Sequence, residues 1–137
     1  MNDSSTVTEA ELKAKAVAPR VTIEDIDANI AHVAYFTARD GVYGTVRLGE
    51  HPQLPQSLGL LTFCVITLKN GFVVTGESAC ASPANFDPEI GRRLAYAQAK
   101  NKIWGFMGYA LRDHLTYGGR SYWAQPVDWS VTDGAPL

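Results

Sequence analysis

The sequence predicts an α+β fold in which an antiparallel β-hairpin or small sheet packs against an N-terminal helix and a long C-terminal helix, or a C-terminal helical hairpin. Three observations support this class. An apolar run rich in β-branched and aromatic residues spans 60–68, and the turn dipeptide Asn70-Gly71 separates it from a second β-prone run. Beyond these runs, apolar residues recur at helical spacing over 88–115.

Length and composition predict one globular domain. The chain has 137 residues, 46% hydrophobic and 19% charged, which suits one buried core. We expect a flexible N-terminal tail over 1–20, a single α+β domain over 21–116 with a glycine-rich insertion at 37–59, and an aromatic tail over 117–137. The net charge of −2 argues against DNA, RNA or a membrane surface as a partner. Without a secretion signal or a long apolar run, we expect a cytoplasmic protein.

The first element of the predicted domain is a helix that begins after Val21. Thr22 suits the N-cap, and Asp25 holds the position that completes a capping box. The helix would continue through an apolar series at helical spacing, Ile23, Ile26, Ile30 and Val33. A short helix near residues 8–12 precedes it, within the flexible tail.

The glycine-rich insertion has one strand candidate, residues 42–48, and reads either as a second hairpin or as a mobile flap. It contains Arg39, Arg47 and His51, which we interpret as exposed loop charges.

The central hairpin has a strand at 60–68 and a return strand at 72–78, joined by Asn70-Gly71 as a two-residue turn. This register places Cys64 opposite Glu77 and Cys80 beyond the paired region, so we expect two reduced cysteines. The three histidines are far apart in sequence, and no spacing suggests a metal site.

The long helix begins at Asp87-Pro88 and carries two apolar stripes. The first has heptad spacing: Ile90, Leu94, Ala97, Asn101, Trp104, Gly108, Leu111 and Leu115. The second follows Tyr96, Ala99, Ile103, Met107 and Ala110. One hairpin and one short helix cannot cover both stripes, so we expect the second to meet another copy of the chain in a homo-oligomer. Gly105 and Gly108 would alternatively divide the segment into a helical hairpin.

Several short strings resemble a family of small tailed-bacteriophage accessory proteins. They are LKNGF at 68–72, GESAC at 76–80, NFD at 85–87, EIG at 89–91, KIW at 102–104 and GYAL at 108–111. The resemblance covers about 21–34 and 60–116 and implies a phage origin, but it implies no catalytic site. By size and setting the chain is also similar to non-enzymatic phage proteins that sequester nucleotide immune signals, such as the cyclic ADP-ribose isomers of Thoeris systems and cyclic oligonucleotides.

This second resemblance implies a nucleotide-binding protein that acts in the host cytoplasm, without turnover and without a cofactor. Phosphates need cationic or N–H donors, and a base needs an aromatic face and a polar group that reads its edge. The residues we expect to supply them are Arg92, Arg93 and Arg112 for phosphates, Phe86 and Tyr109 for stacking, and Asn101 for polar edges.

Two other classes remain open. An enzyme is disfavoured because no nucleophile, phosphate-loop or paired-carboxylate motif occurs, although Glu77, Ser78 and His114 could form an acid–base set. An interaction protein that blocks a host protein, or a minor structural or accessory phage protein, would instead expose aromatic residues of the tail. Those residues are Tyr122, Trp123 and Trp129.

Overall fold

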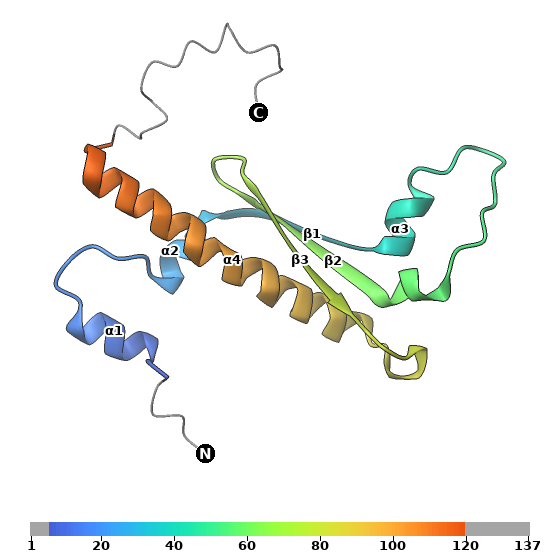
Figure 1. Ribbon diagram of the computed structural model, residues 1–137, viewed down its shortest axis with the longest axis horizontal. Helices are drawn as coiled ribbons and strands as arrows, with labels where there is room; N and C mark the ends of the chain where they lie inside the picture. Colours follow the sequence, from blue (N-terminus) through green and yellow to red (C-terminus); the bar gives the residue numbers. More distant parts are fainter. Residues whose placement is uncertain (1–5, 120–137) are drawn as a thin grey trace, which may run out of the picture.

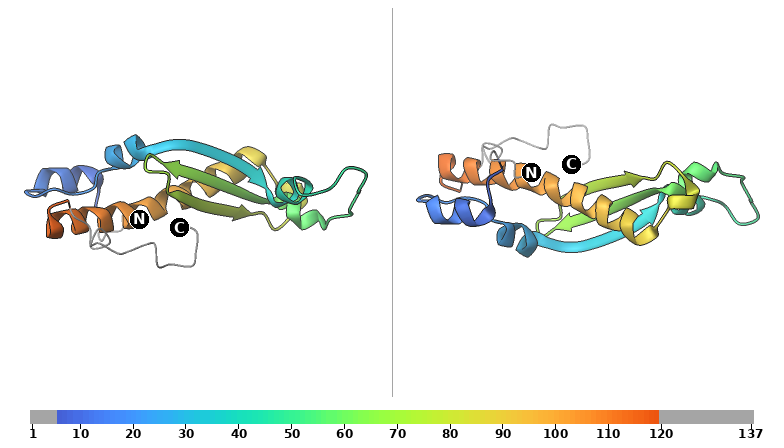
Figure 2. Two further views of the ribbon diagram at one scale, coloured as in Figure 1. Left: turned by 90° about the horizontal axis from the view of Figure 1, so that it is seen from above. Right: turned by 90° about the horizontal axis from the view of Figure 1, so that it is seen from below.

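A three-stranded antiparallel sheet lies against one long helix in the computed structural model, which describes residues 6–119 (Figure 1). The elements in chain order are α1 (Glu9–Lys15), α2 (Ile23–Asn29), β1 (Ile30–Thr37), α3 (Ala38–Tyr43), η1 (Gln56–Leu60), β2 (Leu61–Leu68), β3 (Val73–Ala79), η2 (Pro83–Asn85) and α4 (Pro88–Tyr117). The views in Figure 2 show the sheet as one layer and α4 running beside it. The predicted α+β class is confirmed.

The central hairpin is confirmed, but its predicted register is wrong by one residue. Cys64 pairs with Gly76, not with Glu77. Gly71 has a φ of 89°, and the Leu68 amide donates to the Phe72 carbonyl at 2.8 Å, so the loop has three residues. A slip of one residue exchanges the two faces of a strand. Gly76 therefore faces the helix layer and Glu77 faces away from it.

The predicted N-terminal helix is correct only in its first half. Thr22 and Asp25 form the expected capping box, but α2 ends at Asn29. Ile30 and Val33, which we expected on that helix, lie in β1, which pairs antiparallel with β2. The segment from Ile30 to Thr37 contains β-branched and aromatic residues that suit a strand, and pairing with β2 outweighs the helical spacing.

The predicted strand at 42–48 is also wrong. Thr37 and Asp40 form a capping box that begins α3 directly after β1. The described chain then has no strand until β2 begins at Leu61. Figure 1 shows the connection between α3 and η1 extending away from the sheet.

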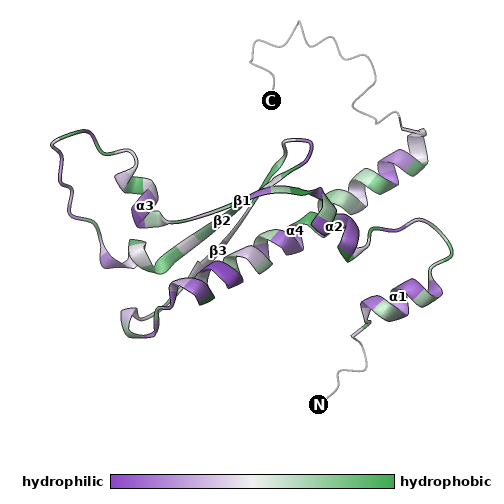
Figure 3. Cartoon of the chain, turned by 180° about the vertical axis from the view of Figure 1, so that it is seen from behind, coloured by the Kyte–Doolittle hydropathy of each residue, from purple (hydrophilic) through white to green (hydrophobic). Residues whose placement is uncertain are grey.

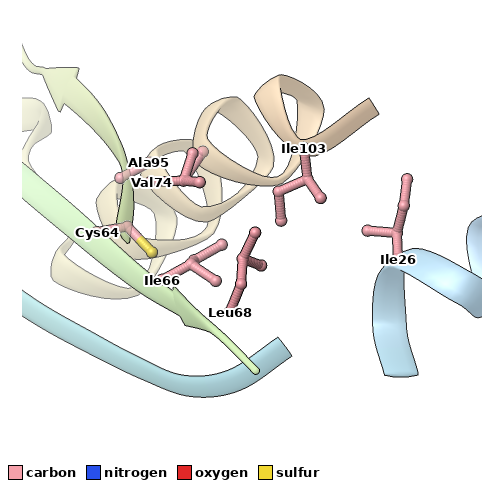
Figure 4. Packing of buried hydrophobic residues seen from close by; sticks show 8 residues of the cluster. Ile26, Cys64, Ile66, Leu68, Val74, Ala95 and Ile103 are labelled. Carbon is pink, nitrogen blue, oxygen red and sulfur yellow. The ribbon is translucent and has the colours of Figure 1, made fainter. Parts of the chain in front are cut away.

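The core lies between α4 and one face of the sheet. Alternate residues of β2 are buried on this face, namely Thr62, Cys64, Ile66 and Leu68. Val74 joins them from β3, Ile103 from α4 and Ile26 from α2, and Figure 4 shows Ile103 pointing towards Leu68 and Ile66. Figure 3 colours the chain by hydropathy, and α4 alternates there between polar and apolar stretches along its length.

The two predicted stripes of α4 exchange roles in the structure. The buried residues of α4 are small, namely Gly91, Ala95 and Ala99, followed by Ile103. Two of these belong to the second stripe, which we expected to meet another copy. The N-terminal part of the first stripe faces away from the sheet, with Ile90 exposed by 52% and Leu94 by 57%, whereas Trp104 of the same stripe packs against the core.

Gly76 explains why small residues occupy the buried face of α4. A Cβ atom added at Gly76 would lie 2.2 Å from the Ala95 carbonyl oxygen and 2.5 Å from the Ala99 amide nitrogen. The backbones of β3 and α4 therefore approach each other too closely for large side chains between them.

The long helix is continuous, so the alternative of a helical hairpin is excluded. The Asp87 carboxylate accepts from the amides of Glu89 and Ile90, and Gly118 ends the helix with a left-handed φ of 62°. Helix α2 contacts α4 through Ile26 and through an ion pair between Lys100 and Asp27 at 2.5 Å.

Helix α1 is present where a short helix was predicted, with no buried residue. It is linked to the next segment by ion pairs between Lys13 and Glu24 at 2.7 Å and between Arg20 and Glu9 at 3.1 Å. The tail residues Tyr122, Trp123 and Trp129 lie outside the described part of the chain.

Side chains of α4 cap the outer edge of β3. Residues 73, 75, 77 and 79 direct their backbone groups away from β2, because the intervening residues form the pairs that exchange hydrogen bonds with it. The Glu77 amide donates to Gln98 Oε1 at 2.7 Å, and Lys102 Nζ donates to the Thr75 carbonyl at 2.6 Å. An uncapped edge strand would be a template for pairing with another chain.

Candidate functional site

The six residues predicted to bind a ligand do not form one site within a protomer. Arg92 and Arg93 lie near the start of α4, Asn101 lies at its middle, and Tyr109 and Arg112 lie towards its end. With a rise of 1.5 Å per residue, Arg92 and Arg112 are about 30 Å apart along the helix. All five of these α4 residues are exposed.

Phe86 lies in a separate small hollow of about 130 Å³ at the start of α4. The walls of this hollow are mostly apolar, and they include Leu60, Cys80, Ile90, Gly91 and Leu94. Neither Arg92 nor Arg93 lines it. The structure therefore does not bring Phe86 together with the cations predicted beside it.

The three residues imagined as an acid–base set are also separated. Glu77 and Ser78 lie at the end of β3, where Gln98 contacts the Glu77 amide. His114 lies sixteen positions further along α4 than Gln98, about 24 Å along the helix axis.

Cys64 is poorly suited to act as a nucleophile. Its side chain is fully buried in the core, and this burial raises the pKa of the thiol. Only the thiolate is strongly nucleophilic, so a raised pKa lowers reactivity at neutral pH. Both cysteines are free thiols, and Cys80 is half-buried.

One ligand-sized hollow lies between α2, the β2–β3 turn and the C-terminal half of α4. We call it the α2–hairpin hollow, and its volume is about 490 Å³. It is lined by Arg20, Val21, Asp25, Ala28, Asn29, Lys69, Met107, Ala110 and Leu111. Ligand pockets in proteins commonly have volumes of about 300–1,000 Å³.

Two cationic side chains flank this hollow. The Arg20 guanidinium pairs with Glu9 and also donates to the Val21 carbonyl at 3.2 Å. Lys69 is exposed, and no carboxylate within residues 6–119 forms an ion pair with its ammonium group. The Lys69 side chain is therefore available to an anionic ligand.

The one carboxylate in the lining is already used by the protein. Asp25 accepts from the Thr22 amide at 2.9 Å, and this hydrogen bond holds the pKa of the Asp25 carboxyl below its ordinary value. The ionised carboxylate is directed to the helix start, where it stabilises the positive end of the helix dipole.

A second hollow of about 220 Å³ adjoins the first and adds aromatic side chains. The two hollows share Asn29, Met107 and Ala110. Phe72 and Phe106 line the second hollow and contact each other edge to face, with ring centroids 5.0 Å apart. Asn70 also lines it. Cations, amides and aromatic rings thus surround one continuous apolar floor.

The hairpin turn fixes the geometry where these hollows meet. The Lys69 amide donates to the Asn29 carbonyl at 3.0 Å, which attaches the end of α2 to the turn. Asn70 Oδ1 accepts from the Phe72 amide at 2.9 Å, and this bond orients the side chain within the turn.

Sequence reasoning missed this site because its parts come from distant segments. The string Lys69-Asn70-Gly71-Phe72 was recognised as a turn, but not as a wall of a hollow. The position of Asn29 beside that turn depends on β1, the strand we did not predict.

Within residues 6–119, no helix combines the length and the apolar character needed to span a membrane. No group of three or more His, Cys, Asp or Glu side chains gathers there in a way that could hold a metal ion.

Comparison with known proteins identifies a family. Searches among curated proteins and among solved structures gave no match. A family model described as "Phage protein (N4 Gp49/phage Sf6 gene 66) family" matches residues 21–115, which include all three strands and nearly all of α4. The resemblance to a phage protein family is confirmed, and the chain belongs to the N4 Gp49/phage Sf6 gene 66 family of phage proteins.

Proposed function

We propose that this phage protein binds and sequesters a small anionic nucleotide in the α2–hairpin hollow and the aromatic hollow beside it. The observation that carries the proposal is that Lys69 and Arg20 flank the same apolar floor that Phe72 and Phe106 border. Phosphates and a planar base need these two kinds of group at neighbouring positions.

Each part of such a ligand has a counterpart in the hollows. The Lys69 ammonium would bind a phosphate, and the Phe72–Phe106 pair would offer an aromatic surface to a base. The amide groups of Asn29 and Asn70 would hydrogen-bond to polar edges. This assignment moves the proposed site away from Arg92, Arg93, Arg112, Phe86, Tyr109 and Asn101.

We infer that binding occurs without chemical turnover, because the groups around the floor bind charge and rings but include no arranged nucleophile and base. In a phage-infected cell, a protein of this kind would act in the host cytoplasm. It would lower the free concentration of an immune signal such as a cyclic ADP-ribose isomer or a cyclic oligonucleotide.

The test is a thermal-shift and calorimetric panel with cyclic ADP-ribose isomers, cyclic dinucleotides, cyclic trinucleotides and AMP. We expect one class to raise the melting temperature of the full chain. Lys69→Gln and Phe106→Leu should each weaken its binding by about tenfold, the effect of losing about 1.4 kcal/mol of contact. Arg93→Gln is the matched control, because Arg93 is exposed and lies outside both hollows.

The fate of the ligand distinguishes a protein that only binds the nucleotide from an enzyme that converts it. Chromatography should recover the bound nucleotide intact after incubation with the protein. Consumption of the ligand would mean an enzyme, and a panel without any shift would contradict nucleotide binding.

A second candidate is a phage protein that binds and inhibits a host protein, or a minor accessory component of the virion. It is favoured by the apolar residues exposed on the outer side of α4, including Ile90, Leu94 and Leu115. Mass spectrometry of purified virions would detect a virion component. Binding of a defined host protein, together with no rise in melting temperature with any nucleotide, would support the role of inhibitor.

A further inference from the structure

The first helix of the chain is attached to the rest of the protein mainly by charge. Helix α1 has no buried residue, and Figure 1 shows it lying apart from the sheet, joined to α2 by a loop. Among residues 6–20, only Glu9 and Arg20 are half-buried, and these two form an ion pair at 3.1 Å. A second and more exposed ion pair joins Lys13 to Glu24 at 2.7 Å. We call residues 6–19 the N-terminal arm.

The space beneath the arm is a hollow and not a packed interface. Its volume is about 390 Å³, and it is lined by Leu12, Lys15 and Ala16 of the arm together with Arg20. Apolar contact therefore contributes little to the attachment, and exposed ion pairs are individually weak because water and salt screen them. A seven-residue helix also has little stability of its own. The arm can therefore detach without disturbing the core.

Arg20 connects the arm with the proposed ligand site. Its side chain lines both the hollow beneath the arm and the α2–hairpin hollow. Of the two cations that flank the α2–hairpin hollow, Lys69 has no carboxylate partner within residues 6–119, whereas Arg20 donates to Glu9 Oε1. A carboxylate and a phosphate compete for the same guanidinium donors. Glu9 therefore occupies a group that an anionic ligand would use.

We propose that the N-terminal arm is an internal competitor for this site, in which the Glu9 carboxylate occupies Arg20 until a ligand phosphate replaces it. The inference rests on the proposed function, because it concerns the α2–hairpin hollow, and it adds regulation to that site. A phosphate on Arg20 breaks the less exposed of the two ion pairs that hold the arm. Ligand binding is thereby coupled to the release of α1.

Calorimetric titration of the full chain with cyclic di-AMP and cyclic ADP-ribose isomers tests the competition. Glu9→Gln should raise the affinity for the nucleotide that binds by about threefold, because no carboxylate then occupies Arg20. In an Arg20→Gln background, Glu9→Gln should have no effect, since the two residues act through one contact. Glu50→Gln is the matched control for charge, because Glu50 is exposed and lies outside both hollows.

NMR spectroscopy tests the attachment of the arm without any nucleotide. The backbone signals of Leu12 and Ala16 report whether α1 is formed, because their amides donate to carbonyls one turn earlier. Glu9→Gln combined with Lys13→Gln removes both ion pairs at an unchanged net charge, and these signals should move to random-coil positions. In the wild type, a bound cyclic nucleotide should move them in the same direction, while the signals of Ile66 in the core stay unchanged.

The outcomes distinguish failure of this inference from failure of the proposed function. A nucleotide that binds wild type and Glu9→Gln equally would overturn the inference and leave nucleotide binding intact. A gain from Glu9→Gln that persists in the Arg20→Gln background would do the same, because it would reflect general repulsion of anions. Signals of α1 that stay helical in the variant without both ion pairs would also overturn the inference. If no nucleotide binds at all, both proposals fail together.

Discussion

At the scale of single residues, Gly76 decides how the two layers meet. The space beside it is filled by the backbone of α4 at Ala95 and Ala99, and backbone atoms cannot rotate away as side chains can. By contrast, a Cβ at Gly105, in the same helix, would meet no atom within 4 Å.

These two glycines should therefore respond in opposite directions to the same substitution. Gly76→Ala forces α4 away from β3, and we expect it to lower the free energy of unfolding by about 3 kcal/mol or more. Gly105→Ala should raise it by about 0.5–1 kcal/mol, because alanine favours the helix. Urea denaturation monitored by circular dichroism measures both. Equal effects of the two changes would contradict the close contact between the layers.

Asp25 gives stability a defined dependence on pH. Hydrogen bonds from Thr22 lower the pKa of this carboxyl in the folded state, and Asp40 has the same relation to Thr37. For a lowered pKa, the stabilisation is complete above the unfolded-state pKa and is lost as the pH falls through the folded-state pKa.

We therefore expect the melting temperature to fall as the pH decreases below about 4, the ordinary range of aspartate pKa values. Asp25→Asn combined with Asp40→Asn should flatten this decline, because neither side chain can then be protonated. Differential scanning calorimetry at a series of pH values measures the slope. An identical slope in wild type and variant would show that the capping boxes do not set the acid limit.

At the scale of secondary structure elements, α4 protects the edge of the sheet as well as covering its face. Gln98 accepts from the Glu77 amide at 2.7 Å. We expect Gln98→Ala to speed hydrogen exchange at the Glu77 amide and to cost about 1 kcal/mol of stability, the usual value of one hydrogen bond.

Hydrogen exchange followed by NMR resolves this effect at single amides. The Cys80 amide is the internal control, because it donates to the Leu60 carbonyl at 3.0 Å and does not involve Gln98. Unchanged protection of the Glu77 amide would mean that Gln98 does not cap the edge in solution.

The elements that the sequence predicts well are those whose signals are local. Neighbouring residues alone determine the helix caps at Thr22 and Asp87 and the turn at Asn70-Gly71. The same holds for the helical spacing of apolar residues that continues after Pro88. The register of the hairpin was missed because it depends on one extra residue in the loop, and a strong turn dipeptide does not specify this number.

The remaining errors come from interactions between distant segments. Ile30 and Val33 fit a helical period, and only the pairing of β1 with β2 makes them part of a strand. The inner face of α4 was misassigned because the larger apolar residues indicated burial, whereas close approach at Gly76 favours the smaller ones. The candidate site was missed for the same reason, since Asn29 lies beside the hairpin turn only because α2 ends there and β1 pairs with β2.

At the scale of the whole molecule, one helix supports three separate surfaces. Its inner face covers β2 and β3, and one flank caps the β3 edge through Gln98 and Lys102. A third side, near Met107, Ala110 and Leu111, lines the α2–hairpin hollow. Ligand binding and protection of the sheet edge are therefore expected to be separable by substitution.

This division of α4 limits how the gene can change. Each residue of an α-helix advances the side-chain direction by about 100°, so one codon inserted near its start would turn every later side chain to a different surface. The small residues of α4 would then no longer face β3, and Gln98 and Lys102 would no longer reach the β3 edge. Point changes on the exposed surface should accumulate readily in related phages, while the length of this segment should stay constant.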